Sequence, residues 1–190
     1  MSKQPHPGTS GWGCFLLKKY GSEPPHIIIE KGGITMFQKF GTLYLDGKPV
    51  SPGLMYTDKA NVSFGSAVPG YELYWKPIPD TSSFILSGPA LLCISWRQLR
   101  DLGFVRGRAF EMDGKVYMVR LPRLGVAPPE KQMPLEGIQF WGEETFIGFN
   151  NKKPEQRCPI GSAAANSWGY AHPSERRPDL GFVPVLDEGI

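Results

Sequence analysis

Short runs in which apolar and polar residues alternate recur along this chain. A period of two is typical of strands that bury one face. The clearest case is the segment in which Tyr71, Leu73 and Trp75 alternate with Glu72 and Tyr74. This pattern predicts a half-buried strand there, and it favours an architecture built mainly from strands.

Three other runs predict strands without such regular alternation: CFLLKKYG at 14–21, HIIIEKGG at 26–33, and the aromatic stretch IQFWGEETFIGFN at 138–150. The second contains three consecutive isoleucines, which have a high strand propensity. We expect that strand to be buried on both faces or to lie at an interface.

Two segments predict β-hairpins. In TLYLDGKPVS the pair Asp46-Gly47 stands between strand-forming residues, and in RAFEMDGKVYMVRLP the pair Asp113-Gly114 does the same. Asp-Gly suits the type I′ turn, in which both central residues have positive φ. On either side of the second turn, every second residue is one of an apolar set: Phe110 and Met112 before the turn, and Val116 and Met118 after it.

One segment, ISWRQLRDLGF, predicts a helix. Ser95 is a candidate N-cap, and Gln98 three residues later completes the spacing of a capping box. Gly103 is a candidate for the left-handed residue that ends a helix. A single face of this helix carries Trp96, Leu99 and Leu102, so we expect the helix to dock on a sheet.

The chain ends in another apolar run, Phe182 to Leu186, although chain ends are usually frayed unless something holds them. Before it lies the irregular segment 138–181, in which Trp168 and Tyr170 are candidate anchors. The pattern predicts an N-terminal arm at 1–10, a small β-rich unit at 11–80 and a second domain at 81–190.

Composition supports short strands over long helices. The 190 residues include 23 glycines and 19 prolines, which favour tight turns, and 41% of the residues are apolar. The expected fold class is β-rich α+β with one clear helix. Charged residues make up 21%, which is ordinary for a soluble globular protein.

Charge and cysteine content exclude several classes. The net charge is only +3 and the basic pairs are isolated, so we expect no nucleic-acid partner. The cysteines are three and widely spaced, which argues against a disulfide framework or a zinc site. The N-terminus has no apolar signal-peptide core, and no run is long enough for membrane insertion.

No recognised catalytic or cofactor motif is present, so we expect no cofactor, no metal and no catalytic residues. His172 has Ser174, Glu175 and Asp179 nearby, but residues so close in one loop rarely form a catalytic triad. Glu143 and Glu144 are adjacent, and adjacent residues on a strand point to opposite faces. We therefore interpret the residues around His172 as a polar surface loop, and Glu143 and Glu144 as part of a strand.

The order of segments resembles a family. LLCISWRQLRDLGFVRGRAFEMDGKVYMVRLP, then an aromatic loop region, then SAAANSWGYAHPSERRPDLGFVPVLD resembles phage- and prophage-associated bacterial proteins with a C-type-lectin-like domain, over roughly residues 82–187. This is the fold of formylglycine-generating enzymes and phage receptor-binding proteins. Val183 stands where the family usually has arginine, and the active-site cysteines of those enzymes have no counterpart.

The resemblance implies that 81–190 is a C-type-lectin-like domain whose first and last strands pair. The C-terminal run would then lie against the RAFEMDGKVYMVRL hairpin, with Pro184 at an edge or a bulge. It further implies a non-enzymatic binding protein, such as a virion component of the tail or baseplate. One alternative is an intracellular phage inhibitor of a host defence protein, and another is an enzyme of unknown class.

The expected partner is a virion or host protein or a cell-surface glycan, with a possible homo-oligomer, and the expected location is the virion or the host cytoplasm. The candidate contacts, each equally compatible with the core, are Trp141, Phe146, Phe149, Trp168, Tyr170, His172, Arg176 and Arg177. Because exposed arginines contribute little to stability, exchange of Arg176 and Arg177 for alanine should weaken binding and leave the melting temperature almost unchanged.

Overall fold

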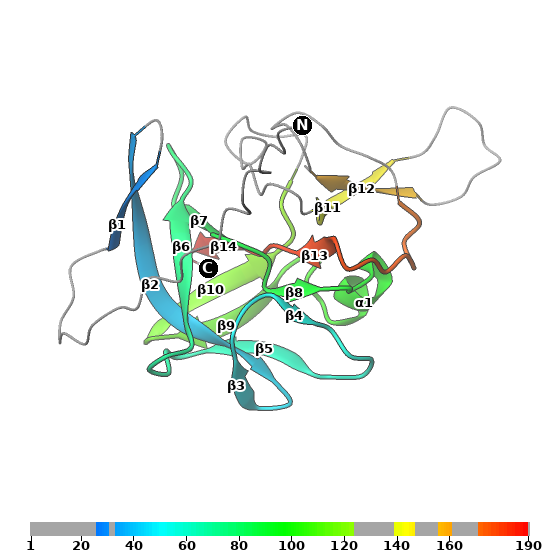
Figure 1. The fold of residues 1–190 in the computed structure, drawn as a ribbon, viewed down its shortest axis with the longest axis horizontal. Coiled ribbons are helices and arrows are strands. Elements are labelled where there is room, and N and C mark those ends of the chain that lie inside the picture. The colour runs from blue at the N-terminus through cyan, green and yellow to red at the C-terminus, as the bar shows by residue number, and fades with distance from the viewer. Residues whose placement is uncertain (1–25, 31–32, 124–138, 147–155, 161–170, 190) are drawn as a thin grey trace, which may run out of the picture.

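A computed structural model describes residues 26–30, 33–123, 139–146, 156–160 and 171–189. These residues form two β-sheets and one short helix (Figure 1). The expectation of a β-rich α+β fold is confirmed at this level. The expected arm at 1–10 and the expected strand at 14–21 lie outside the described residues.

The larger sheet has the strand order β1-β2-β6-β7-β14-β10-β9, with β3 and β5 also paired to β2. All of its pairings are antiparallel. The sheet curls into a half-barrel, so that β5 comes back beside β9 (Figure 1). Its strands are β1 (His26–Glu30), β2 (Gly33–Leu45), β3 (Lys48–Val50), β5 (Val62–Gly65), β6 (Glu72–Pro77), β7 (Ser83–Leu86), β9 (Arg108–Met112), β10 (Lys115–Arg120) and β14 (Val185–Glu188).

The smaller sheet has the order β12-β11-β13-β8-β4. It mixes directions, because β11 runs parallel to β13 and β4 runs parallel to β8. It therefore joins segments that are distant in the sequence. Its strands are β4 (Leu54–Met55), β8 (Leu91–Leu92), β11 (Gln139–Phe146), β12 (Gln156–Ile160) and β13 (Leu180–Phe182).

Both predicted hairpins are present. Asp46 and Gly47 have φ of 50° and 74°, and Asp113 and Gly114 have φ of 51° and 78°. Positive φ at both central residues is the signature of a type I′ turn. In the second hairpin the inward positions on β10 are Tyr117 and Val119, whereas Val116 is exposed.

The second hairpin is tied to the other end of the curled sheet by its turn. The Asp113 carboxylate accepts hydrogen bonds from the backbone N–H groups of Gly41 (2.8 Å) and Ala67 (2.7 Å). Gly41 has a φ of +66°, and a Cβ there would lie 2.8 Å from the sulfur of Met112. These contacts hold the turn of the second hairpin against β2 and the end of β5, where the curled sheet brings β5 beside β9.

The predicted helix is α1 (Trp96–Asp101), and its ends follow the sequence signals. Ser95 accepts a bond from the Gln98 backbone, and the Gln98 side chain accepts one from the Ser95 backbone, which completes the capping box. Gly103, with a φ of +89°, follows the C-cap. Trp96 and Leu99 are buried, and Leu102 packs against the core.

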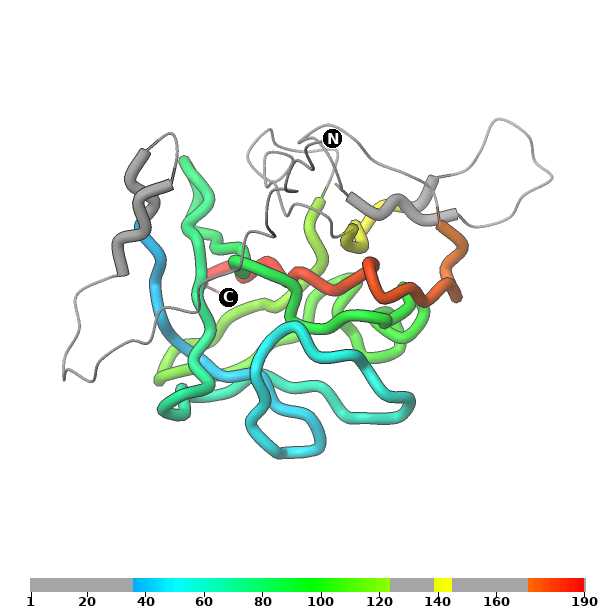
Figure 2. The backbone as a smooth tube through the Cα atoms, viewed as in Figure 1, coloured from blue at the N-terminus to red at the C-terminus, as the bar shows by residue number. Residues whose placement is uncertain are grey.

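The C-terminal run crosses the middle of the molecule (Figure 2). Its first part, β13, pairs with β8 and β11 in the smaller sheet, and its second part, β14, lies between β7 and β10 in the larger sheet. Pro184 lies in the break between these strands, where its missing N–H costs no ladder bond. The expectation that this run lies against the second hairpin is confirmed.

Around the helix, the core is aromatic. The Phe104 ring packs against the rings of Phe64, Phe110 and Phe182, with centroids 6.0, 6.0 and 4.9 Å away. Phe64 comes from the segment before residue 80 and Phe182 from the C-terminal strand. The expected boundary at 80/81 thus separates residues that share one core, and it falls between β6 and β7, which pair with each other.

Candidate interaction surface

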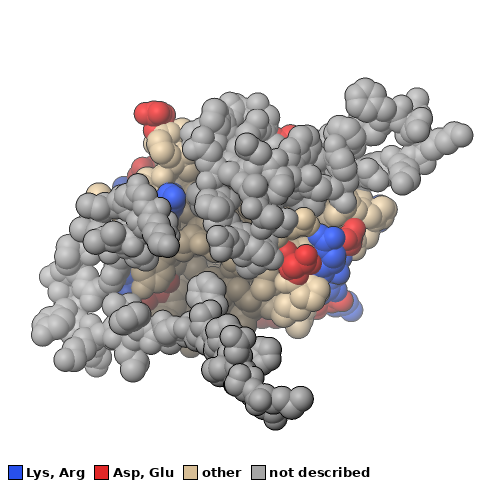
Figure 3. Space-filling model, turned by 45° about the horizontal axis from the view of Figure 1, so that its top comes forward, with Lys and Arg blue, Asp and Glu red and all other residues tan. Residues whose placement is uncertain are grey.

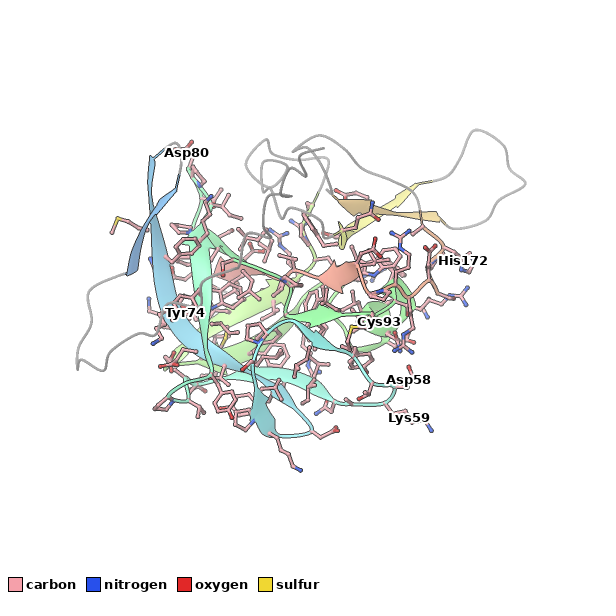
Figure 4. The ribbon with its side chains drawn as sticks, viewed as in Figure 1. Asp58, Lys59, Tyr74, Asp80, Cys93 and His172 are labelled. Atoms are coloured by element: carbon pink, nitrogen blue, oxygen red, sulfur yellow. The ribbon has the colours of Figure 1, made fainter. Side chains whose placement is uncertain are left out.

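The loop 171–179 is fastened to the rest of the molecule by Arg176. Its guanidinium donates to the Cys93 carbonyl (2.8 Å), the Asp58 carboxylate (2.7 Å) and the Tyr56 carbonyl (2.8 Å). Asp58, Cys93 and His172 lie at one end of the molecule in Figure 4. We call residues 56–59, 93–98 and 171–179 at this end the clamp surface.

Asp58 links the Arg176 clamp to the helix. Its Oδ1 accepts from Arg176 and also from Nε2 of Gln98, both at 2.7 Å. The Tyr56 hydroxyl donates to the Ala60 carbonyl at 2.9 Å and so closes the loop that carries Asp58. Burial raises the pKa of Tyr56, so its hydroxyl stays protonated as this bond requires. The clamp surface is thus a braced arrangement of three chain segments.

Cys93 adopts an unusual backbone conformation within this surface. Its φ is +56°, a left-handed value that is unfavourable for a residue with a Cβ. Two hydrogen bonds hold it there: its N–H donates to Leu180 (2.9 Å) and its carbonyl accepts from Arg176. Cys93 is a free cysteine. Cys14 and the side chain of Cys158 lie outside the described part of the chain.

His172 is exposed and takes part in a local turn. The ring nitrogen Nδ1 accepts a hydrogen bond from the Ser174 backbone N–H at 3.3 Å. The backbone N–H of His172 donates to the Glu175 carboxylate at 3.2 Å. A catalytic triad needs the acid on Nδ1 and the serine hydroxyl on Nε2, and these contacts do not have that form. The arrangement agrees with a polar surface loop.

Arg177 fixes the same loop to the smaller sheet. It hydrogen-bonds to the Gln139 side chain in β11 and forms ion pairs with Glu175 (3.1 Å) and Asp179 (3.2 Å). Its side chain is half-buried. Both arginines that were expected to contact a partner therefore make internal contacts as well.

Trp141 is a core residue. Its side chain is fully buried, and its Nε1 donates to the Ile94 carbonyl at 2.7 Å. Trp141 is therefore not available to a partner, because its ring projects from β11 into the core behind the helix. Phe146 has a described backbone, paired with Gln156, but its side chain lies outside the described part, as do Phe149, Trp168 and Tyr170.

The two carboxylates considered as an acid/base pair lie on β11. Glu143 forms an ion pair with Arg123 at 2.6 Å, and its backbone N–H donates to Pro122. These two contacts join β11 to the segment that follows β10, so Glu143 has a structural role.

Sequence reasoning missed Tyr56, Asp58 and Gln98 as parts of this surface. Asp58 and Arg176 are 118 residues apart. No periodicity or turn signal relates positions at such a separation, so only the folded chain brings them together.

Replacement of Arg176 by alanine is expected to lower the free energy of unfolding by about 1–3 kcal/mol, because it removes three hydrogen bonds from a charged donor. This replaces the expectation that exchange of Arg176 and Arg177 for alanine leaves the melting temperature almost unchanged, which treated both side chains as exposed and without internal bonds. Urea unfolding followed by circular dichroism measures the loss. Arg97→Ala is the control, since Arg97 is exposed and its side chain has no partner among the described residues. Equal stability of the two variants would contradict the clamp.

Comparisons with known proteins add no relative: no protein-family model, no curated protein and no solved structure matches this chain significantly. Within the part of the chain that the structure describes, no group of three or more histidine, cysteine or carboxylate side chains is placed to hold a metal ion. Among the same residues, no helix is long and apolar enough to cross a membrane.

Proposed function

We propose that this chain is a non-enzymatic binding protein of a phage or prophage, with a C-type-lectin-like domain in residues 81–190 that recognises its partner through loops. A virion component of the tail or baseplate is the preferred setting. The partner is a virion or host protein, or a cell-surface glycan.

The observation that carries this proposal is the position of the last strand. Within 81–190 the first strand is β7 and the last is β14, and these two pair antiparallel, with Val185 opposite Ile85 and Asp187 opposite Ser83. Pairing of the first and last strands is what the resemblance to C-type-lectin-like domains implies. The ends of this segment meet, and a long excursion in the sequence separates β10 from β13, within which β11 lies beside β13 in the smaller sheet.

A rigid frame that holds such an excursion suits recognition, because loops on a scaffold carry binding. The return of the excursion is braced by Arg176 and Arg177. Bracing lowers the conformational entropy that binding has to remove, so a preformed loop favours affinity.

The use of the polar side chains favours binding over catalysis. The His172 and Glu175 side chains accept hydrogen bonds from backbone N–H groups of their own turn, and Glu143 pairs with Arg123. His172, Glu175 and Glu143, which suggested acid or base chemistry, are thus engaged in structural contacts.

The test uses the tagged full-length chain as bait against purified phage particles and, separately, against host lysate. We expect capture of a virion protein, and the double variant Lys59→Glu with His172→Ala should weaken it by about tenfold or more, because both exposed side chains lie on the clamp surface. Lys48→Glu, at the exposed start of β3, is the matched control and should bind normally.

Three results would contradict the proposal. Capture of a single host protein from lysate, with nothing from particles, would favour the intracellular inhibitor. Turnover of a substrate by the purified chain would favour an enzyme. Equal loss of capture in both charge-reversal variants would move the contact surface away from the clamp.

A further inference from the structure

A second surface lies beside the clamp and is rich in arginine. Between residues 97 and 108 the chain has four arginines and a single acid, Asp101, whereas the whole chain is nearly balanced in charge. Side chains of both signs are visible on the face drawn in Figure 3. All four arginines are exposed. We call this set the arginine surface: Arg97, Arg100, Arg106 and Arg108.

The fold gathers these arginines around α1. Arg97 and Arg100 are three residues apart on the helix and so lie on one face. A Cβ on Gly103, just after the helix, would lie 3.7 Å from Cδ of Arg108, which places that side chain over the end of the helix.

The arginine surface is continuous with the clamp surface. The backbone N–H of Arg97 donates to the Pro173 carbonyl at 3.0 Å, so the helix and the loop 171–179 touch. A partner that meets His172 on the clamp surface therefore also meets the first arginine.

These arginines differ from the others in their charge partners. Arg120, Arg123 and Arg176 each face a carboxylate from another part of the chain. Among the described residues, the carboxylate that pairs with Arg100 is that of its neighbour Asp101. Among the described residues, no carboxylate lies within ion-pair distance of the three remaining members of the set, Arg97, Arg106 and Arg108. Their positive charge is available to a partner.

Aromatic rings hold two of the arginines without neutralising them. The Arg108 guanidinium lies over the Phe110 ring at 4.9 Å, and that of Arg100 lies over the Trp96 ring at 6.0 Å. Such contacts orient a guanidinium without neutralising it. Arg108 has no carboxylate partner among the described residues, whereas Nε and Nη2 of Arg100 donate to the Asp101 carboxylate. The surface is therefore ordered before a partner arrives.

We propose that the arginine surface binds a segment rich in aspartate and glutamate on a partner protein. This inference rests on the proposed binding function and names the chemistry of the partner. A guanidinium donates two parallel hydrogen bonds to one carboxylate, which suits acidic side chains spaced along a peptide.

A nucleic acid fits this surface less well. Single strands are bound by stacking bases on exposed aromatic rings, but here Trp96 and Phe110 are buried beneath the arginines. Asp101 and Glu111 are exposed in the same region, and both would repel a continuous row of phosphates. A peptide can place uncharged residues opposite these two acids.

The test measures binding of a fluorescein-labelled oligo-glutamate peptide to the full-length chain by fluorescence anisotropy. We expect Arg97→Gln with Arg108→Gln to weaken binding by about tenfold or more. Lys48→Gln with Lys76→Gln removes the same charge elsewhere and should change it less than about twofold. Melting curves of both variants confirm that each is folded.

Several outcomes would overturn the inference. These are no binding of the peptide at low salt, equal weakening in the two double variants, or tighter binding of a single-stranded oligonucleotide with the same dependence on the arginines. If Arg97→Gln with Arg108→Gln still captures the partner from particles normally, the inference fails and the proposed function stands. If the peptide binds as expected but no partner is captured, the proposed function fails and the arginine surface stands.

Discussion

A chain that ends at Pro178 is expected not to fold. The truncation removes β13 and β14, and with them Leu180, Phe182, Val183, Val185 and Leu186, all fully buried. Loss of a large buried side chain costs about 2–5 kcal/mol, and the stability of a whole domain is only about 5–15 kcal/mol. The summed free-energy cost of losing these five side chains therefore exceeds the stability of a whole domain.

The loss extends beyond side-chain burial. β14 lies between β7 and β10, so its removal leaves each of these strands with one unpaired edge and separates the larger sheet into two parts. The Phe104 ring also loses Phe182, the ring nearest to it. We expect the truncated chain to be insoluble on expression, or to melt without a cooperative transition in circular dichroism.

The matched control is a chain that ends at Glu188, the last residue of β14. It keeps every paired position of that strand and should melt like the full-length protein. A soluble, cooperatively melting chain ending at Pro178 would show that the C-terminal run is not part of the core.

The second large effect is expected for Asp187→Ala, which should lower the free energy of unfolding by about 3 kcal/mol. The Arg120 side chain is only 5% exposed and forms two hydrogen bonds with the Asp187 carboxylate, at 2.6 and 3.0 Å. Removal of the carboxylate takes two hydrogen bonds and their negative charge from a buried guanidinium. The Ser83 hydroxyl, which donates to Asp187 at 2.7 Å, loses its partner as well.

Two variants separate the ion pair from general effects. Lys115→Ala breaks the exposed pair with Glu188 and should cost less than about 1 kcal/mol. The double variant Arg120→Met with Asp187→Leu removes both charges and should recover much of the stability that Asp187→Ala loses. Urea unfolding measures all three. A stable Asp187→Ala protein would show that Arg120 finds another counter-charge.

The same pair predicts a dependence on pH. Burial works to raise the pKa of Asp187, but the hydrogen bonds from Arg120 and Ser83 outweigh it, so the pKa lies below its ordinary value. This contribution to stability is complete above the unfolded-state pKa of about 4 and is lost as the pH falls through the lower folded-state pKa. We expect the wild-type protein to lose stability in this acid range more steeply than Asp187→Ala.

The sequence alone determined the local elements of this protein. Asp46-Gly47 and Asp113-Gly114 predicted two turns that the structure contains, because only a few residue pairs accept positive φ at both positions. Ser95 and Gln98 predicted the start of the helix, because capping is settled within one turn of the chain. Alternation placed Tyr71, Leu73 and Trp75 on one face. Leu73 and Trp75 do face the core, whereas Tyr71 precedes β6 and is exposed.

Only the tertiary structure decided which of these elements meet, and that determines the candidate surface. Tryptophan is common in binding surfaces, but Trp141 is buried and bonded to the Ile94 carbonyl. Arg176 pairs with Asp58, which is 118 residues away in the sequence. The apparent boundary at 80/81 is crossed by the pairing of β6 with β7. Residue type and periodicity act over a few positions, whereas burial depends on the side chains that the whole fold brings into contact.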